Sequence, residues 1–456
     1  MEQHSPIQRA IATANGSVVE SFSIWGLPGK FRVEKSFNFF RRSQNFPAQL
    51  LFSYPPKNTL NDKIGEFIVP RGVIVRPVEN FNALLNSPVG IHITFIPNEE
   101  SPVFCVCFTR FELLQYPSDL IQETSMTSIY STQQLETVRV YCITTRSPDI
   151  SLLTPIIQDL FMTDFCFKEQ WIKQFYLKTI PLIPQFKYQS TATRLYPLLD
   201  SLKNLHTDQP TLDLLSKHAI IRLFSVTKIA GILAMVSSLL LNISVFLIGR
   251  NIPLVTDCAL SLIPLLGPFE WEGVIIPYIP SHLYEFLESP LPSIFGTEMP
   301  TEPVNISAFV APVEPLGLMD NIDKIFLNNE KTPLPIPYFE DVFMELKNLC
   351  DREIVEILRM SSYEERMVAI NKSGKGEKFG MEVMKIMKER FYDKIIGKIT
   401  LFCKINGPLT FKEFQEKFPN TIPSGSLRTW YSEFVMSQHF SSWWIRNKMS
   451  NLQKSS

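Results

Sequence analysis

The chain has 456 residues, enough for two or three domains with separate hydrophobic cores. Its 44 basic and 45 acidic side chains nearly balance, which excludes the strongly basic class of nucleic-acid-binding proteins and any global attraction to anionic membranes. With 35 phenylalanines but only 18 glycines, the composition favours packed cores over low-complexity sequence.

The cysteines and the N-terminal residues carry little functional signal. The seven cysteines are scattered and include no C-x-x-C pair. Cys105 and Cys107 would place both thiols on one face of a strand, which is neither a disulfide nor a zinc spacing. We therefore expect buried, reduced thiols in a cytoplasmic protein. Residues 1–20 are polar, lack the pattern of a signal peptide and are expected to form a disordered tail.

Residues 21–165 have a β-rich pattern and are expected to form a first domain. Strands are predicted at residues 22–25, 49–54, 89–96, 103–110 and 138–144, a short helix at 58–65, and an extended segment at 66–70. The strands 89–96 and 103–110 flank a polar loop containing Pro97, which predicts a hairpin. Ser147 followed by Pro148 predicts the start of a helix that runs to about Met162. Residues 166–212 are interpreted as a linker with some helix.

The most apolar run of the chain, residues 229–249, contains no charged side chain. Its length would allow a membrane span. Four polar residues interrupt it: Ser237, Ser238, Asn242 and Ser244. Because polar side chains are unfavourable in lipid, we favour a buried helix with Thr227 as its N-cap, followed after Asn242 by a buried strand. A membrane span at 229–249 remains the less favoured alternative.

The residues after this run continue an alternation of helix and strand. A helix is predicted from residue 251 to 262, where Pro264 would stop it. A second short strand is predicted at 274–276, and Ser281 is expected to cap a helix that ends near Glu288. Helices that alternate with strands imply parallel strands joined by crossovers, and therefore an α/β domain.

The last part of the chain is predicted to be helical. Residues 297–340 contain many prolines and are expected to be mostly loop, with a helix near 320–327. Helices are predicted at residues 342–359, 362–370, 378–400, 411–418 and 427–449. Trp443 and Trp444 are expected to dock the last helix onto the domain instead of anchoring it at a membrane interface. The lysines between 372 and 388 alternate with glutamates, which favours a solvated helix over a lipid-binding patch.

Motifs for covalent or metal chemistry are missing from the sequence. The glycine-rich segment 373–378 lacks the spacing of a phosphate-binding loop and is expected to be a solvated interhelical loop. The six histidines are isolated from one another, and no G-x-S-x-G motif occurs. We therefore predict no catalytic residue, no cofactor and no metal ion.

An ordered set of residues in the central stretch resembles the motif of the DENN domain family, which has the form PF-W…IP-LP…L…L-aP-P-I-G. The matching residues are Pro268-Phe269, Trp271, Ile276-Pro277, Ile279-Pro280, Leu283, Leu287, Pro290, Pro292, Ile294 and Gly296. The order of elements at 21–165 and the helical tail are similar to the upstream and downstream modules of the family. One departure is the segment Asn242 to Ser244, where the family has an acidic residue followed by basic ones.

The resemblance implies a two-lobed α/β fold. Its parts would be a disordered tail at 1–20, an upstream longin-like lobe at 21–165, a linker at 166–212, a central α/β module at 213–330 and an all-α downstream module at 331–456. The resemblance also implies a guanine-nucleotide exchange factor that binds a Rab-family small GTPase, displaces its switch regions and promotes GDP release in membrane trafficking. Two alternatives stay open, a non-catalytic GTPase-binding or scaffold protein and a GTPase-activating protein.

A surface that spans both lobes would contact the GTPase in this family. The residues predicted to form it are Asn61, Asp62 and Arg71 on the first lobe, and Arg250, Asn251 and Thr256 after the central strand. The expected partner is a Rab-family GTPase, with no nucleic acid. The protein is expected in the cytoplasm, with at most peripheral association with endomembranes.

Overall fold

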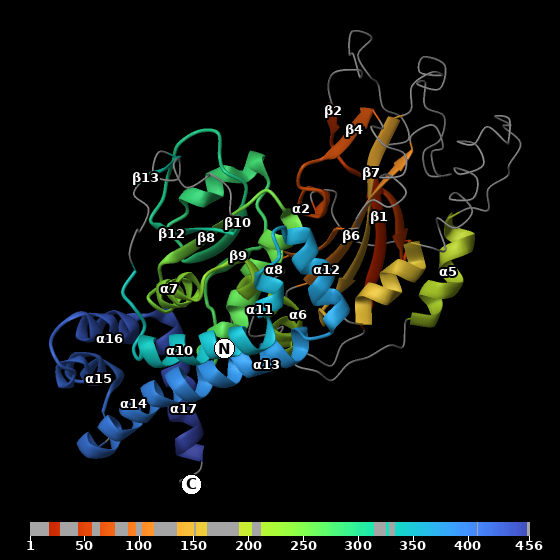
Figure 1. Cartoon of the computed structure of the whole chain (residues 1–456). Helices are drawn as coiled ribbons and strands as arrows, with labels where there is room; N and C mark the ends of the chain where they lie inside the picture. Colours follow the sequence, from red (N-terminus) through yellow and green to blue (C-terminus); the bar gives the residue numbers. More distant parts are fainter. Residues whose placement is uncertain are drawn as a thin grey trace, which may run out of the picture. The chain divides into compact units, whose positions relative to one another are not determined.

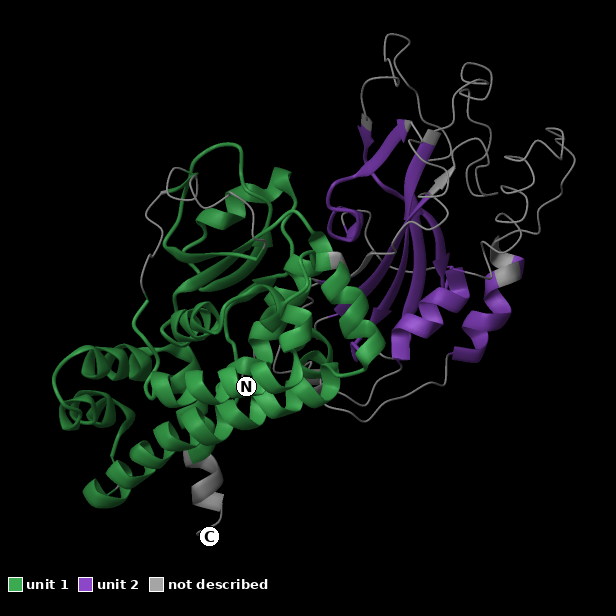
Figure 2. Ribbon diagram, in the orientation of Figure 1, with its two compact units in different colours: residues 1–12, 210–456 green, residues 13–209 purple. Residues whose placement is uncertain are grey.

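Strands dominate the first of two units into which the chain divides, and helices dominate the second. The units lie within residues 13–209 and 210–456 (Figures 1 and 2). The computed structural model describes residues 18–27, 44–56, 64–77, 90–96, 103–113, 135–149, 152–161, 191–202, 211–313, 325–327, 333–407 and 409–453. The predicted fold class, α/β with an all-α tail, is confirmed.

The first unit is built on a seven-stranded sheet around β7. Its strands are β1 (Ser21–Gly26), β2 (Gln44–Phe46), β3 (Gln49–Tyr54), β4 (Val73–Pro77), β5 (Gly90–Ile96), β6 (Val103–Leu113) and β7 (Leu135–Thr145). β6 pairs with one edge of β7, whereas β1 and β4 pair with the other, all antiparallel. The predicted hairpin is confirmed, because β5 and β6 pair from Gly90–Thr109 to Ile96–Val103.

Two local predictions in this unit were wrong. The segment predicted as extended contains the helical turn α2 (Gly65–Ile68), because Ile68 is buried and Gly65 packs so closely on Trp25 that a Cβ there would lie 2.5 Å from the ring. The helix described over 152–161 is capped by Asp149, whose Oδ1 accepts a hydrogen bond from Leu152 N at 3.2 Å, and not by Ser147. A second helix, α5 (Thr191–Leu202), belongs to this unit. Residues 58–63 of the other predicted helix lie outside the described part.

The second unit contains a parallel sheet in the order β12-β8-β10-β9. Its elements in chain order are α6 (Thr211–Val226), α7 (Ile229–Leu240), β8 (Ser244–Ile248), α8 (Ile252–Leu265), β9 (Val274–Ile276), the 3-10 helix η2 (Ser281–Glu288), β10 (Ser293–Thr297), β11 (Val304–Asn305), β12 (Ala308–Pro312) and β13 (Phe326–Leu327). The predicted parallel α/β arrangement is confirmed, and every side chain of β8 is buried.

The apolar run 229–249 is divided between α7 and β8, as predicted. Among the described helices, none has the length and apolar character that a membrane crossing requires. Three details differ from prediction. Lys228, and not Thr227, is the N-cap of α7; α8 continues through Pro264; and Phe326–Leu327 is a strand that pairs with β11, where a helix was expected.

The tail is helical, as predicted. Its elements are α10 (Phe339–Glu353), α11 (Val355–Leu358), α12 (Tyr363–Ser373), α13 (Gly376–Met387), the π-helical turn η3 (Lys388–Tyr392), α14 (Asp393–Asn406), α15 (Phe411–Lys417), the 3-10 turn η4 (Pro419–Thr421), α16 (Ser426–Met436) and α17 (Gln438–Gln453). Gly374, with φ of 61°, ends α12 in the left-handed conformation that glycine adopts easily. The connection between the two helices is therefore shorter than the predicted loop 373–378. It consists of Gly374 and Lys375 alone, because α12 includes Ser373 and α13 begins at Gly376.

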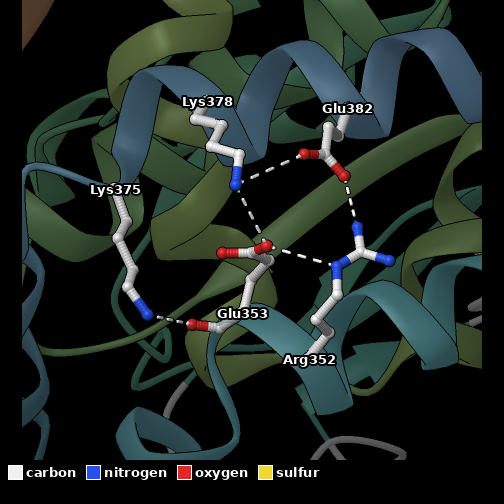
Figure 3. A network of polar contacts seen from close by, with 5 residues as sticks. All are labelled: Arg352, Glu353, Lys375, Lys378 and Glu382. Atoms are coloured by element: carbon white, nitrogen blue, oxygen red, sulfur yellow. Dashed lines mark hydrogen bonds and ion pairs between the residues drawn. The ribbon is translucent and has the colours of Figure 1, made fainter.

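The lysines near this connection form ion pairs on the surface (Figure 3). Glu353 of α10 accepts from Arg352 Nε at 3.2 Å and from Lys378 Nζ at 3.3 Å, and its carbonyl accepts from Lys375 Nζ at 2.8 Å. Arg352 also pairs with Glu382 of α13. These contacts join α10 to α13 and neutralise much of the basic charge, which agrees with a solvated helix face.

Candidate functional site

The carboxyl ends of β8 and β10 mark a place in the second unit where a binding surface is expected. These strands are neighbours, but the chain leaves them in opposite directions, from β8 to β9 at one edge and from β10 to β12 at the other. Open α/β sheets bind their ligands at such points. Gly249 N donates to Thr297 O at 3.0 Å and Val313 N to Ile248 O at 3.0 Å, so the residues after the strands are held in register.

Two of the predicted contact residues lie at this edge. Arg250 lies two residues after the end of β8 and is exposed. Asn251 is the N-cap of α8, and its side chain accepts a hydrogen bond from Leu254 N at 3.1 Å. Thr256, by contrast, is fully buried and donates to Pro253 O at 3.0 Å, so it packs in the core and adds nothing to the exposed surface.

The remaining predicted contact residues belong to the first unit. Arg71 is exposed in the turn between α2 and β4. Asn61 and Asp62 lie outside the described residues. The structure therefore brings Arg250 and Asn251 together, and contact of any of these residues with a GTPase stays a prediction.

A buried ionic cluster joins α8 to the helices around it. Asp257, about one and a half turns into α8, is fully buried and forms an ion pair with Arg222 of α6. His218 lies one turn earlier on α6, and its Nε2 is 3.4 Å from Asp257 Oδ1. Arg222 also donates to Asn371 Oδ1 of α12 at 3.4 Å. These contacts connect α6, α8 and α12 near the N-terminal turns of α8.

The electrostatics of the cluster keep Asp257 ionised. Burial alone would raise the pKa of Asp257, but the positive charge of Arg222 and the hydrogen bond that Arg222 donates outweigh burial and hold this pKa below its usual value. Burial and the charge of Arg222 lower the pKa of His218, which favours its neutral form. The buried carboxylate and guanidinium therefore compensate each other, as buried charges require.

The segment that departs from the family pattern has local structural roles. Asn242 adopts a left-handed conformation with φ of 60° where α7 ends, and its N–H donates to Leu239 O at 3.1 Å. Ser244 Oγ accepts from Ser293 N at 3.0 Å and donates to Leu291 O at 3.4 Å. These contacts join the start of β8 to the segment before β10 without a charged side chain.

The aromatic residues of the motif join the central sheet to the helical tail. Phe269 packs against three tail rings, at centroid distances of 5.7, 4.9 and 5.5 Å, those of Tyr392, Phe434 and Trp443. Trp271 stacks on His439 of α17 with ring centroids 4.8 Å apart. The predicted docking of the last helix onto the domain is confirmed.

His439 makes this junction sensitive to acid. Burial lowers the pKa of His439 to about 4, from about 6.5 in an unfolded chain. Folding therefore favours the neutral imidazole of His439. The contribution of His439 to the free energy of unfolding is complete above pH 6.5 and is lost as the pH falls towards 4. We expect wild type to lose about 2 kcal/mol more unfolding free energy than His439→Phe between pH 7 and pH 5, measured by urea denaturation. Parallel curves of unfolding free energy against pH for wild type and His439→Phe would contradict the prediction.

Sequence reasoning missed the ionic cluster, although a signal was present. Asp257 is the one charged residue of the otherwise apolar helix α8, all of which is described. His218 and Arg222 are four residues apart and therefore share a face of α6. A lone charge in a buried helix requires a partner, but the sequence alone did not indicate which helix supplies it.

Comparison with known proteins finds similarity to DENN domain proteins. The DENN (AEX-3) domain profile matches residues 136–314, from β7 of the first unit past β12 of the second. DENN domain-containing protein 2A of Mus musculus is 24% identical over 225 residues, 48% of this chain and 21% of that protein. The Homo sapiens protein of the same name is 23% identical over 222 residues, again 48% and 21% of the two chains. DENN domain-containing protein 1C of Mus musculus is 24% identical over 210 residues, 46% of this chain and 23% of that protein.

The matches therefore cover only about a fifth of the length of these relatives. The matched region contains the central sheet, the Pro268-to-Gly296 motif and the edge that carries Arg250. Within this motif, Phe269 and Trp271 pack the central module against the helical tail. Over residues 136–314 the chain is similar to the DENN domain.

Proposed function

We propose that this chain is a guanine-nucleotide exchange factor for a Rab-family small GTPase in membrane trafficking. The DENN domain at residues 136–314 supports this proposal most strongly, because members of the family generally exchange nucleotide on Rab GTPases. The chain would bind the GTPase, displace its switch regions and promote GDP release, so that GTP can load.

Such an activity depends on differential binding and needs no nucleophile or acid–base pair. An exchange factor binds the nucleotide-free GTPase more tightly than the loaded form, and by linkage it weakens nucleotide binding by the same factor. An acceleration of ~10³-fold corresponds to about 4 kcal/mol. An interface of standard size can supply this difference.

Arg250 is the residue of the second unit that we propose as a direct GTPase contact. It is exposed at the carboxyl end of β8, and the hydrogen bonds after β8 and at the N-terminus of α8 hold its backbone on both sides. A fixed backbone reduces the entropy that is lost on binding. Arginine is also enriched among the residues that dominate binding energy at protein interfaces.

Retention of purified Rab GTPases on the immobilised full chain tests this proposal. Each GTPase is offered nucleotide-free, GDP-bound and GTP-bound. We expect one or a few Rab proteins to be retained most strongly when nucleotide-free, and Arg250→Ala to weaken that retention by about tenfold, roughly 1.4 kcal/mol. The control is Arg359→Ala, because Arg359 is an exposed arginine at the C-cap of α11, and its guanidinium pairs with the equally exposed Glu356.

A non-catalytic GTPase-binding protein is the second candidate. The observation in its favour is the segment Asn242 to Ser244, where local hydrogen bonds replace the charged residues usual in the family. For such a protein, retention would be equal for all nucleotide states or strongest for the GTP-bound form. Stimulated GTP hydrolysis in the same samples would instead indicate a GTPase-activating protein. Either result would contradict the proposed exchange activity.

A further inference from the structure

One face of α14 is apolar and exposed to solvent. Leu401 is 59% exposed and Ile405 is 73% exposed. Gly397 lies one turn before Leu401, and a Cβ at this position would meet nothing within 4 Å. Residues at i, i+4 and i+8 form one row along a helix. We call Gly397, Leu401 and Ile405 the α14 row.

The opposite face of α14 fixes the direction of this row. Ile395, Ile399 and Phe402 are buried there. The Phe402 ring packs against Phe414 of α15 at a centroid distance of 5.7 Å and against Phe418 at 5.4 Å. Because the buried face holds the helix in a single rotation, the α14 row faces solvent in the folded chain.

Lysines border the α14 row on both sides. With 100° per residue, Lys404 lies on one side of the row and Lys394 and Lys398 on the other. Lys394 Nζ is 2.7 Å from Asp341 Oδ2, and Lys398 Nζ lies 5.1 Å from the centre of the Tyr338 ring, so both are held at this border. No acidic residue follows Asp393 within α14. Because Asp341 compensates the charge of Lys394, Lys398 and Lys404 provide the basic charge at the margins of this apolar face.

We propose that the α14 row is a docking site for an acidic amphipathic helix of a partner protein. Such a helix would place its apolar side chains on Leu401 and Ile405, approach closely at Gly397, and direct carboxylates towards the bordering lysines. This partner differs from the GTPase, and the proposal does not rest on the exchange activity.

Charge and size argue against the other occupants of this face. A second copy of the chain would bring the lysines of two α14 helices towards one another, and like charges at an interface oppose pairing. A membrane surface requires a helix with a long apolar face, whereas the α14 row offers two large apolar side chains. An acidic amphipathic helix would cover the apolar centre with its own apolar side chains and place its carboxylates beside the lysines.

Binding of a synthetic probe to the full chain tests the proposal. The probe is a fluorescent helical peptide with leucines at every third and fourth position, flanked by glutamates, and binding is followed by anisotropy. We expect the double variant Leu401→Ser/Ile405→Ser to weaken binding at least tenfold. The matched control is Val368→Ser/Met381→Ser, because these apolar residues are similarly exposed on α12 and α13. The control should bind like wild type, and all three proteins should unfold at the same temperature.

Three results would overturn the proposal. The first is equal binding of the peptide by the double variant and wild type. The second is binding to phosphatidylserine vesicles that the double variant loses, combined with no binding of the peptide. The third is a wild-type dimer that the double variant abolishes in sedimentation experiments. A peptide with lysines in place of the glutamates should not bind, and equal binding of this peptide would contradict the role of the basic margins.

Discussion

Asp257→Ala is expected to lower the free energy of unfolding by about 3–5 kcal/mol. The substitution leaves the buried Arg222 guanidinium without its carboxylate, while Arg222 stays largely shielded from water. The uncompensated charge, and not the lost attraction alone, causes most of the destabilisation. Urea denaturation of the variant and wild type, followed by circular dichroism, measures the difference.

A double variant separates the charge effect from a packing effect. Arg222→Met/Asp257→Leu replaces both charges with apolar groups and should recover most of the stability, since a buried ion pair adds little over a well-packed apolar pair. Asp341→Ala is the matched control, because Asp341 pairs with Lys394 at the surface. Asp341→Ala should lower the free energy of unfolding far less than Asp257→Ala does. A loss for Asp257→Ala as small as that of the control would show that Asp257 does not hold the cluster together.

Gly296→Ala is expected to destabilise the central sheet by about 3 kcal/mol or more, at the upper end for overpacking. A Cβ at Gly296 would lie 1.9 Å from Pro277 O and 2.5 Å from Val255 Cγ1. The backbone cannot simply move away, because Ile279 N donates to Gly296 O at 2.7 Å and β10 is paired on both sides. Thermal and urea denaturation measure the change.

Gly397→Ala provides the contrast with Gly296→Ala. Gly397 lies in the interior of α14 in open space, so alanine there should stabilise the protein by about 0.5–1 kcal/mol through the smaller backbone entropy of the unfolded chain. Opposite signs for the two variants would confirm that close packing requires glycine in the motif. A tolerated Gly296→Ala would contradict the packing role of this residue.

The sequence predicted the helices and the central parallel strand well, because long apolar runs and capped helices carry their own signals. It missed β10 and β12, which are five residues long, flanked by prolines and paired with β8 on opposite sides. β10 has no alternating pattern because all five of its residues are buried, and in β12 the buried and partly exposed residues do not alternate either. Their structure depends on the strand beside them, and this neighbour cannot be read from local sequence.

The candidate site was predicted only in part. The exposure of Arg250 follows from its position as the first charged residue after the apolar run. The burial of Thr256 does not follow from the local sequence, because the helices and strands that pack on α8 surround it only in the folded unit. The ionic cluster was missed for the same reason, since Asp257 and Arg222 are 35 residues apart. The burial of Thr256 and the Asp257–Arg222 ion pair both depend on contacts between elements that are far apart in the sequence.

Release of fluorescent GDP from a panel of purified Rab GTPases tests the central proposal most directly, with catalytic amounts of the full chain and excess GTP. We expect faster release for one or a few members, with one molecule of the chain acting on many GTPases, and slower exchange with Arg250→Ala than with Arg359→Ala. Release at the intrinsic rate from every member, by a chain that is folded and monodisperse, would contradict the proposed exchange activity.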